Sequence, residues 1–197
     1  ESLPRWLAEE WVAWLGPEEA LRLARAMNLP APLCLRSPRR DELGLRLRAA
    51  GLEAAPAARA PSGLVLKGGS VQAVARAAGG LPFQVQDEGA QLATLFAALD
   101  LAGRPARVLD ACAAPGGKAV HLAELLAPGS EVVAVEIHPR KAEALSREAG
   151  GRGLPVRVVC GDAARPIPGL EPASFDAVLV DAPCAGLGTL RRHPELK

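Results

Sequence analysis

Apolar side chains recur at helical spacing in some stretches of this chain and form short unbroken runs in others. In residues 3–15 they recur at steps of three and four, which predicts an amphipathic helix with Trp11 and Trp14 on its buried face. The elements expected in the first part of the chain are helices over 3–15 and 17–26, a strand over 33–35, a helix over 41–50 and a strand over 64–67. Together they predict a small α+β subdomain over residues 1–80, in which 54–61 is a loop.

Strand and helix patterns alternate regularly after Gly79 and Gly80. The elements expected here are a lead-in helix over 86–99, strands over 107–110, 131–135, 156–159 and 176–180, and intervening helices over 118–126 and 139–149. This order predicts an α/β fold with a Rossmann-like parallel sheet over residues 81–197. Too few strands are present to complete such a sheet, so we expect a C-terminally truncated domain.

The first of these strands runs into a turn of small residues, which limits what could bind there. Such a turn brings free backbone amides to the carboxyl edge of the sheet, where open α/β sheets bind ligands. A dinucleotide site needs G-x-G-x-x-G, which Ala113 and Pro115 do not match. A phosphate-binding P-loop needs a glycine and a hydroxyl group where Cys112 and Ala119 stand. S-adenosylmethionine (SAM) remains as the candidate ligand, and the alternative is that the turn serves packing alone.

Carboxylates follow successive strands of the expected parallel sheet. Asp110 could bind the amino group of the methionine moiety of SAM, and Glu136 could accept hydrogen bonds from both ribose hydroxyls. Asp162 would then lie beside the adenine, and Asp181 would face the transferable methyl group. The alternative for each acid is a merely solvated strand end, which is less favoured where two acids flank such a turn.

The last strand end also carries a cysteine, in the run from Asp181 to Cys184. Enzymes that methylate exocyclic amines commonly have an aromatic ring here to stack on the base, and this run has none. A cysteine suits attack on carbon, because C5 of a pyrimidine becomes nucleophilic once a thiolate adds to C6. The alternative is a small buried apolar role for Cys184, the role that we assign to Cys112 and Cys160.

Composition and charge limit the size, cellular location and partners that we expect for this protein. The chain has 197 residues, an apolar fraction of 49% and a net charge of +1, enough for one domain and a small companion. No apolar run could cross a membrane, and residues 1–5 do not resemble a signal peptide, so we expect a soluble, cytoplasmic protein. The four cysteines form no C-x-x-C pair, so we expect no metal site. Arginines concentrate within residues 22–48, which predicts either a nucleic-acid-binding surface or a merely solvated one.

Several motifs together resemble those of the Sun/Fmu-type RNA cytosine-5 methyltransferases. They are residues 110–118 (DACAAPGGK), 181–184 (DAPC) and 191–194 (RRHP), with 85–88 (VQDE) and Gln91 matching the lead-in helix of the family. The resemblance is greatest to bacterial members that act on 16S ribosomal RNA. It implies SAM as the cofactor and small-subunit ribosomal RNA as the partner, and we expect a monomer. By this resemblance the residues that bind SAM are Asp110, Cys112, Ala113, Ala114, Pro115, Gly116, Gly117, Lys118, Glu136, Asp162 and Asp181.

The resemblance also implies catalytic roles. In this family the nucleophile is a cysteine from a later strand end, and the cysteine of the D-A-P-C motif, here Cys184, assists product release. No cysteine follows residue 184, so we expect a fragment whose nucleophile lies beyond residue 197. Lys118 would help orient a flipped cytosine, and Asp181 would hydrogen-bond its N3 or amino edge. The basic side chains expected to contact RNA are Arg36, Arg39, Arg40, Arg191, Arg192 and His193, with ordinary exposed positions as the alternative.

Three functions therefore compete. The first is methyl transfer from SAM to C5 of a cytosine in ribosomal RNA. The second is an RNA-binding module that keeps SAM as a structural ligand, and the third is a small-molecule methyltransferase. The third predicts no RNA affinity, whereas phosphate contacts would make RNA binding weaken with salt.

Overall fold

The computed structural model describes residues 3–192, which belong to two compact units. One unit combines Glu1–Pro32 with Pro183–Lys197, as far as these are described, and the other spans Leu33–Ala182. None of the helices within the described part of the chain is both long and apolar enough to cross a membrane. The domain boundary expected near residue 80 stays a prediction.

The first unit is helical. Its elements are α1 (Arg5–Leu15), α2 (Pro17–Ala26) and the short 3-10 helix η2 (Leu187–Thr189). The two long helices were both expected, and Gly16 between them has a φ of +79°, a conformation that glycine adopts without steric cost. Leu7 is buried, but Trp14 is 80% exposed, so the expected core position of Trp14 is wrong. Two short helices offer little surface with which to cover a side chain of this size.

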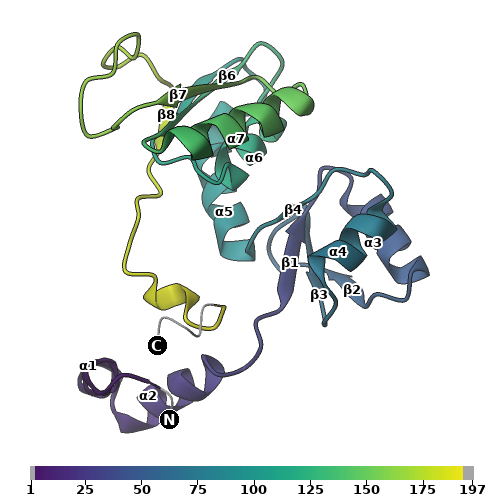
Figure 1. The fold of residues 1–197 in the computed structure, drawn as a ribbon, viewed down its shortest axis with the longest axis vertical. Helices are drawn as coiled ribbons and strands as arrows, with labels where there is room; N and C mark the ends of the chain where they lie inside the picture. Colours follow the sequence, from purple (N-terminus) through teal and green to yellow (C-terminus); the bar gives the residue numbers. More distant parts are fainter. Residues whose placement is uncertain (1–2, 193–197) are drawn as a thin grey trace. The chain divides into compact units, whose positions relative to one another are not determined.

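The second unit begins with a four-stranded antiparallel sheet in the order β2-β3-β1-β4. Its elements are β1 (Leu33–Arg36), α3 (Arg40–Ala49), β2 (Ala54–Pro56), β3 (Gly63–Leu66), α4 (Val71–Ala78) and β4 (Gln84–Val85). Helices α3 and α4 pack on this sheet (Figure 1), where Leu43 and Leu47 of α3 share a core with Leu35 and Leu66 of the strands. The small α+β fold is confirmed. The sequence pattern missed β2, β4 and α4, because the two strands are very short and the alanines of α4 give little contrast.

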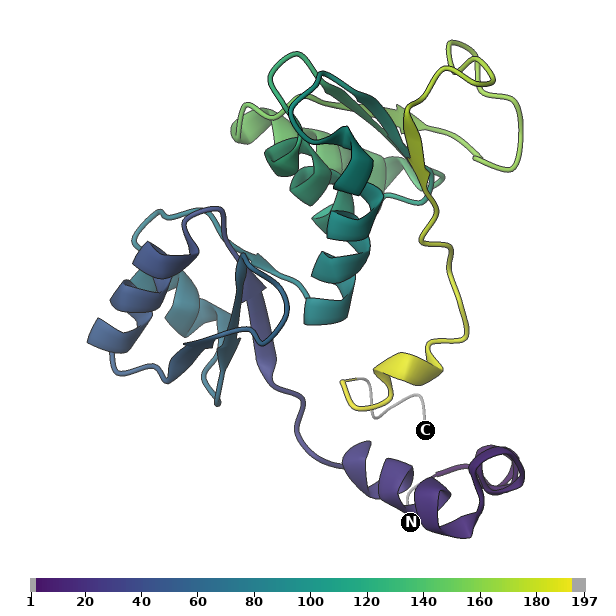
Figure 2. The ribbon, with the colours of Figure 1, turned by 180° about the vertical axis from the view of Figure 1, so that it is seen from behind.

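A four-stranded parallel sheet follows, in the order β7-β6-β5-β8, which confirms the expected α/β class. Its elements are α5 (Glu88–Ala97), the 3-10 helix η1 (Leu99–Leu101), β5 (Arg107–Asp110), α6 (Gly117–Leu125), β6 (Glu131–Glu136), α7 (Pro139–Gly151), β7 (Val156–Cys160) and β8 (Ala177–Leu179). Helices α5, α6 and α7 pack against the sheet (Figure 2), and Val108, Val132, Leu122 and Leu145 form much of the core. Phe96 of α5 is 77% exposed.

The register of the parallel strands sets the positions of the acidic side chains. Asp110 at the end of β5 pairs with Ala134 of β6 on one side and with Leu179 of β8 on the other. Glu136 and Asp181 each lie two residues beyond these partners. Because side chains alternate between faces with a period of two, the three acids fall on corresponding positions of neighbouring strands at one edge.

Candidate functional site

The turn between β5 and α6 (residues 111–116) has a tightly determined path. Gly116 precedes the first residue of α6 with a φ of +110°, and a Cβ atom there would lie 2.4 Å from Cδ1 of Leu145. The backbone N–H of Ala113 donates to the carbonyl of Val135 at 2.9 Å, which ties the turn to β6. The turn also contains a cis peptide bond. It delivers the first amides of α6, which have no partners within the helix, to the carboxyl edge of the sheet.

Asp110 is the most unusual ionisable group at this edge. It is only 1% exposed, and among the described residues neither of its carboxylate oxygens has a hydrogen-bond partner at good distance and angle. Burial raises the pKa of Asp110 to about 6, although the nearby backbone amide of Cys112 and the charge of Lys118 act in the opposite direction. A buried carboxylate without partners is costly, so this position suits a cationic or hydrogen-bond-donating ligand.

The acids at the ends of the neighbouring strands approach the same place. Cys112 is half-buried in the turn, and its pKa is raised by burial and then by the negative charges of Asp110, Glu136 and Asp181. These three carboxylates therefore lie around the turn, as the register of the sheet requires. Glu136 is itself buried and accepts a hydrogen bond from the backbone N–H of His138 at 2.8 Å.

Lys118 and Asp181 form an ion pair across the site. Lys118 lies in the first turn of α6 with its side chain 19% exposed, while Asp181 follows β8 with its side chain 57% exposed. Both charges are therefore accessible to a substrate, and the lysine is held by the acid near the end of the sheet. Asp162, after β7, is more peripheral: its oxygens bind the backbone N–H of Ala164 at 3.0 Å and pair with Arg165 at 3.3 Å.

The cysteines do not all occupy the positions expected of them. Cys184 is exposed and belongs to the first unit, beyond the point where the chain leaves the parallel sheet. Cys160 is also exposed, so its expected role as a buried apolar side chain is wrong. It is the final residue of β7, an edge strand of the parallel sheet, and the part of the chain that the structure describes leaves it exposed. Cys112 is partly buried. Cys34, for which the sequence predicted no role, is buried.

Arg36 was expected to contact RNA, and the structure contradicts this. The residue is 1% exposed on β1, and its guanidinium pairs with Glu124 and donates to Gln84 and, at 2.7 Å, to Gln86. A phosphate could not reach it. The sequence shows only an arginine at the end of a short apolar run, and its ion pair with α6 is decided by tertiary contacts.

The other basic residues are closer to the surface. Arg39 is more than half exposed and pairs with Glu42, and Arg40 pairs with Asp41 while donating to the Pro61 carbonyl. Arg191 donates to the carbonyls of Leu29 and Pro30 at 2.9 and 2.8 Å, and Arg192 donates to the carbonyl of Pro32 at 3.5 Å. Both therefore hold protein carbonyls in this structure. His193 lies outside the described residues.

Sequence reasoning did not predict that three further polar side chains would be buried. Gln86, Gln91 and His121 are nearly inaccessible, and each has at least one side-chain atom without a hydrogen-bond partner among the described residues. Burial, and secondly the charge of Arg36, lower the pKa of His121 to about 3, so the imidazole is neutral. For Gln91 of α5 and His121 of α6 the available signal was a polar side chain on the inner face of an amphipathic helix, whereas Gln86 lies between β4 and α5 and gave no such signal.

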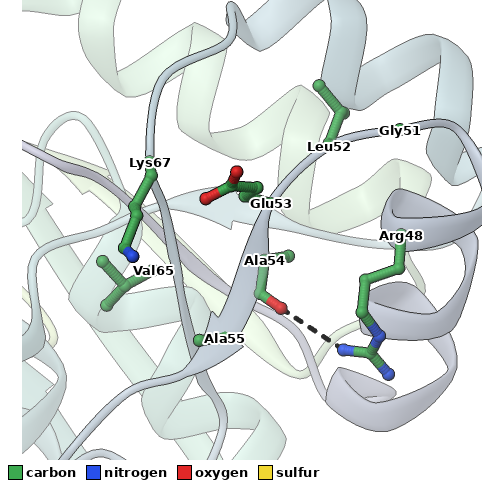
Figure 3. Close-up of a pocket in the computed structure, with 8 residues that line it drawn as sticks. All are labelled: Arg48, Gly51, Leu52, Glu53, Ala54, Ala55, Val65 and Lys67. Atoms are coloured by element: carbon green, nitrogen blue, oxygen red, sulfur yellow. Dashed lines mark hydrogen bonds between the residues drawn. The ribbon is translucent and has the colours of Figure 1, made fainter.

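A separate hollow of about 490 Å³ lies on the antiparallel sheet (Figure 3). It is lined by the end of α3 and by β2 and β3, and Arg48 donates to the Ala54 carbonyl on its rim. Lys67 and Glu53 extend over the opposite side. None of its lining residues belongs to the edge of the parallel sheet that carries Asp110.

Comparison with known proteins finds two family models that match. The 16S rRNA methyltransferase RsmB/F model matches residues 98–197, and the ferredoxin-like domain model of the RsmF/B-like methyltransferases matches residues 3–72. Ribosomal RNA small subunit methyltransferase B of Pseudomonas syringae is 37% identical over 98% of this chain and 43% of that protein. The probable ribosomal RNA small subunit methyltransferase B of Bacillus subtilis is 34% identical over 100% of this chain and 44% of that protein.

The crystal structure of PH0851 has a similar fold, with 28% identity and a TM-score of 0.84 over 98% of this chain and 44% of that chain. This chain thus spans less than half the length of the curated relatives that it matches. Since the methyltransferase match begins just before β5 and runs through the whole parallel sheet, the chain belongs to the 16S rRNA methyltransferase RsmB/F family.

Proposed function

We propose that the full-length protein containing this chain transfers the methyl group of SAM to C5 of a cytosine in small-subunit ribosomal RNA. Family membership supports this proposal, and one observation at the site carries it. The buried carboxylate of Asp110, at the end of β5 beside the Pro-Gly-Gly turn, has no hydrogen-bond partner of good geometry among the described residues. Because this chain spans 43% of its Pseudomonas syringae relative, the activity, substrate and partners of the whole protein are all part of the proposal.

The residues around the turn fit SAM. The two free oxygens of Asp110 would accept from the amino group of the methionine moiety, whose positive charge would offset the cost of burying the carboxylate. Glu136 would accept from the ribose hydroxyls, since only one of its oxygens is bound to the His138 amide. Asp162 would accept from the exocyclic amine of the adenine. When bound, SAM supplies the electrophilic methyl group.

The Lys118–Asp181 pair would hold the base. A cytosine in RNA must leave its stack to reach such a site, and its Watson–Crick edge is then read by hydrogen bonds. Asp181 is exposed enough to accept from that edge, and Lys118, restrained by Asp181, would bind a base oxygen. Holding the base in one orientation supplies much of the advantage over reaction in solution.

Covalent activation accounts for reaction at carbon. The thiolate of a cysteine outside this chain would add to C6, and the electron pair of the C5–C6 double bond would form the new bond from C5 to the methyl carbon. The bond from that carbon to the sulfonium sulfur would break, and its electron pair would stay on the sulfur of the departing thioether. A base would then remove the C5 proton, and the electrons of that C–H bond would restore the double bond as the sulfur leaves. Cys184, whose thiol is exposed, would assist this release step.

We expect the Cys184→Ala variant of the full-length protein to accumulate a covalent complex with its RNA. Methylation would proceed to the adduct, but sulfur would leave slowly. Incubation with SAM and 16S ribosomal RNA, followed by denaturing electrophoresis, would show a shifted band that unaltered protein lacks.

The matched control is Cys160→Ala, which also removes an exposed cysteine, here the last residue of β7. It should turn over normally and trap no adduct. Two results together would contradict the proposed function. The unaltered protein would methylate C5 of no cytosine, and the Cys184→Ala variant would form no adduct.

A further inference from the structure

Arg36 lies at the centre of a buried polar network that joins the antiparallel sheet to the parallel one. From β1 its guanidinium reaches Gln84 of β4, Gln86 of the lead-in segment and Glu124 of α6. Glu124 is 9% exposed and also pairs with Arg152 at the end of α7. Burial lowers the pKa of Arg36 to about 10, so that the guanidinium stays charged at neutral pH.

Gln86 extends this network to the turn at the candidate SAM site. Its Oε1 accepts from Arg36 at 2.7 Å, its carbonyl accepts from Nε2 of Gln91 at 3.0 Å, and its backbone N–H donates to Cys34 at 3.1 Å. The two backbone bonds hold the residue in place, and the bond from Arg36 orients its side-chain amide, whose Nε2 lies 3.7 Å from where an added Cβ atom of Gly117 would be. The amide therefore packs against the first residue of α6.

The network thus holds α6 at two places. Gln86 supports its start, next to the turn, and Glu124 is bound about two helical turns later. Both supports end on the same guanidinium, which the antiparallel sheet carries. The turn amides that would hold SAM lead directly into the start of α6. Loss of the guanidinium would remove both supports of this helix together.

We propose that Arg36 is a positioning residue that connects the antiparallel sheet to the SAM site, so that its loss weakens SAM binding. The inference rests on the proposed function, because it takes the turn to be where SAM binds. It also predicts coupling in the other direction: ligands that order the antiparallel sheet would change SAM affinity, since energetic coupling between sites is reciprocal.

The test is the dissociation constant of SAM for the 197-residue chain, measured by isothermal titration calorimetry. Arg36→Met keeps the apolar stem and removes the guanidinium, and it should raise the dissociation constant about tenfold. Arg36→Lys should give a smaller rise, because an ammonium can keep the pair with Glu124 but cannot also reach Gln86. Gln86→Leu, which leaves the ion pair in place, provides an independent variant and should raise the constant by a similar factor.

The matched control is Leu66→Ala, a buried position in the core of the same antiparallel sheet that takes no part in the network. It loses stability but should bind SAM within roughly twofold of the unaltered chain. All measurements are made at a temperature where thermal melts show every variant folded.

Unchanged SAM binding in both Arg36→Met and Gln86→Leu would overturn the inference, as would equal weakening in Leu66→Ala. Absence of SAM binding by the unaltered chain would instead overturn the proposed SAM site itself, and the inference with it.

Discussion

At the scale of single residues, Asp110 shows how the same side chain acquires different chemistry from its surroundings. An acid after an apolar run is visible in the sequence. Its 1% exposure, and the absence of a hydrogen-bond partner for its oxygens among residues 3–192, are properties of the folded chain. Burial raises its pKa from 3.8 to about 6. The folded chain therefore holds a proton in that pH window that the unfolded chain has lost, and ionisation of Asp110 reduces stability as the pH rises through it.

We expect Asp110→Asn to stabilise the ligand-free chain at pH 8 by about 3 kcal/mol and to leave stability at pH 3.5 nearly unchanged, since a shift of one pKa unit corresponds to about 1.4 kcal/mol. The asparagine is neutral at both pH values, so it removes only the cost of the buried charge. Urea unfolding at the two pH values measures the difference.

The Asp110→Asn variant should at the same time lose SAM binding, because the asparagine amide carries no negative charge to pair with the amino group of the methionine moiety. Asp162→Asn, at a side chain that is 39% exposed, is the control and should change stability little at either pH. Equal stabilisation by Asp110→Asn at both pH values would contradict the assigned cause.

At the scale of elements, the turn between β5 and α6 can be predicted from the sequence, but the restrictions on its individual residues cannot. Proline and two glycines indicate a turn in the sequence, but they do not show which glycine is indispensable. Gly116 has a positive φ and faces Leu145 of α7, whereas Gly117 lies in open space apart from Gln86. Neighbouring glycines therefore differ in what they tolerate.

Gly116→Ala should destabilise the chain by about 3 kcal/mol, because the new methyl group both strains the backbone and meets a buried leucine. Gly117→Ala is the matched control. Its Cβ atom would stay at ordinary contact distance, so it should be neutral or stabilise α6 by less than about 1 kcal/mol. Chemical denaturation compares the two, and equal losses would show that the backbone conformation of Gly116 is not the decisive factor.

At the scale of the whole molecule, the arginines expected to contact RNA separate into different roles. Arg36 serves the interior, Arg191 and Arg192 bind carbonyls of their own unit, and Arg39 and Arg40 remain on the surface beside acidic neighbours. Among the described residues expected to contact RNA, Arg39 and Arg40 are thus the ones best placed to meet phosphates.

We expect RNA binding by the full-length protein to weaken with salt, and Arg39→Ala/Arg40→Ala to reduce the slope of log affinity against log salt by about 1 to 2. The measurement is a titration of labelled ribosomal RNA at several ionic strengths. Arg147→Ala, an exposed arginine of α7, is the control and should leave the slope unchanged. If the double variant has the same slope as the unaltered protein, Arg39 and Arg40 do not contact the RNA phosphates.

The sequence alone determined the parts of this protein that depend on local pattern. Helical spacing and short apolar runs predicted the parallel strands, their helices and the turn at Pro115–Gly117, since burial of one face imposes a period that is visible without the fold. Only the tertiary structure decided which polar groups became buried. Arg36 and Gln86 lie far from Glu124 and Gly117 along the chain, and their contacts arise only when two sheets come together around α6. Periodicity reports the environment of a single element, and it carries no information about which partners other elements bring.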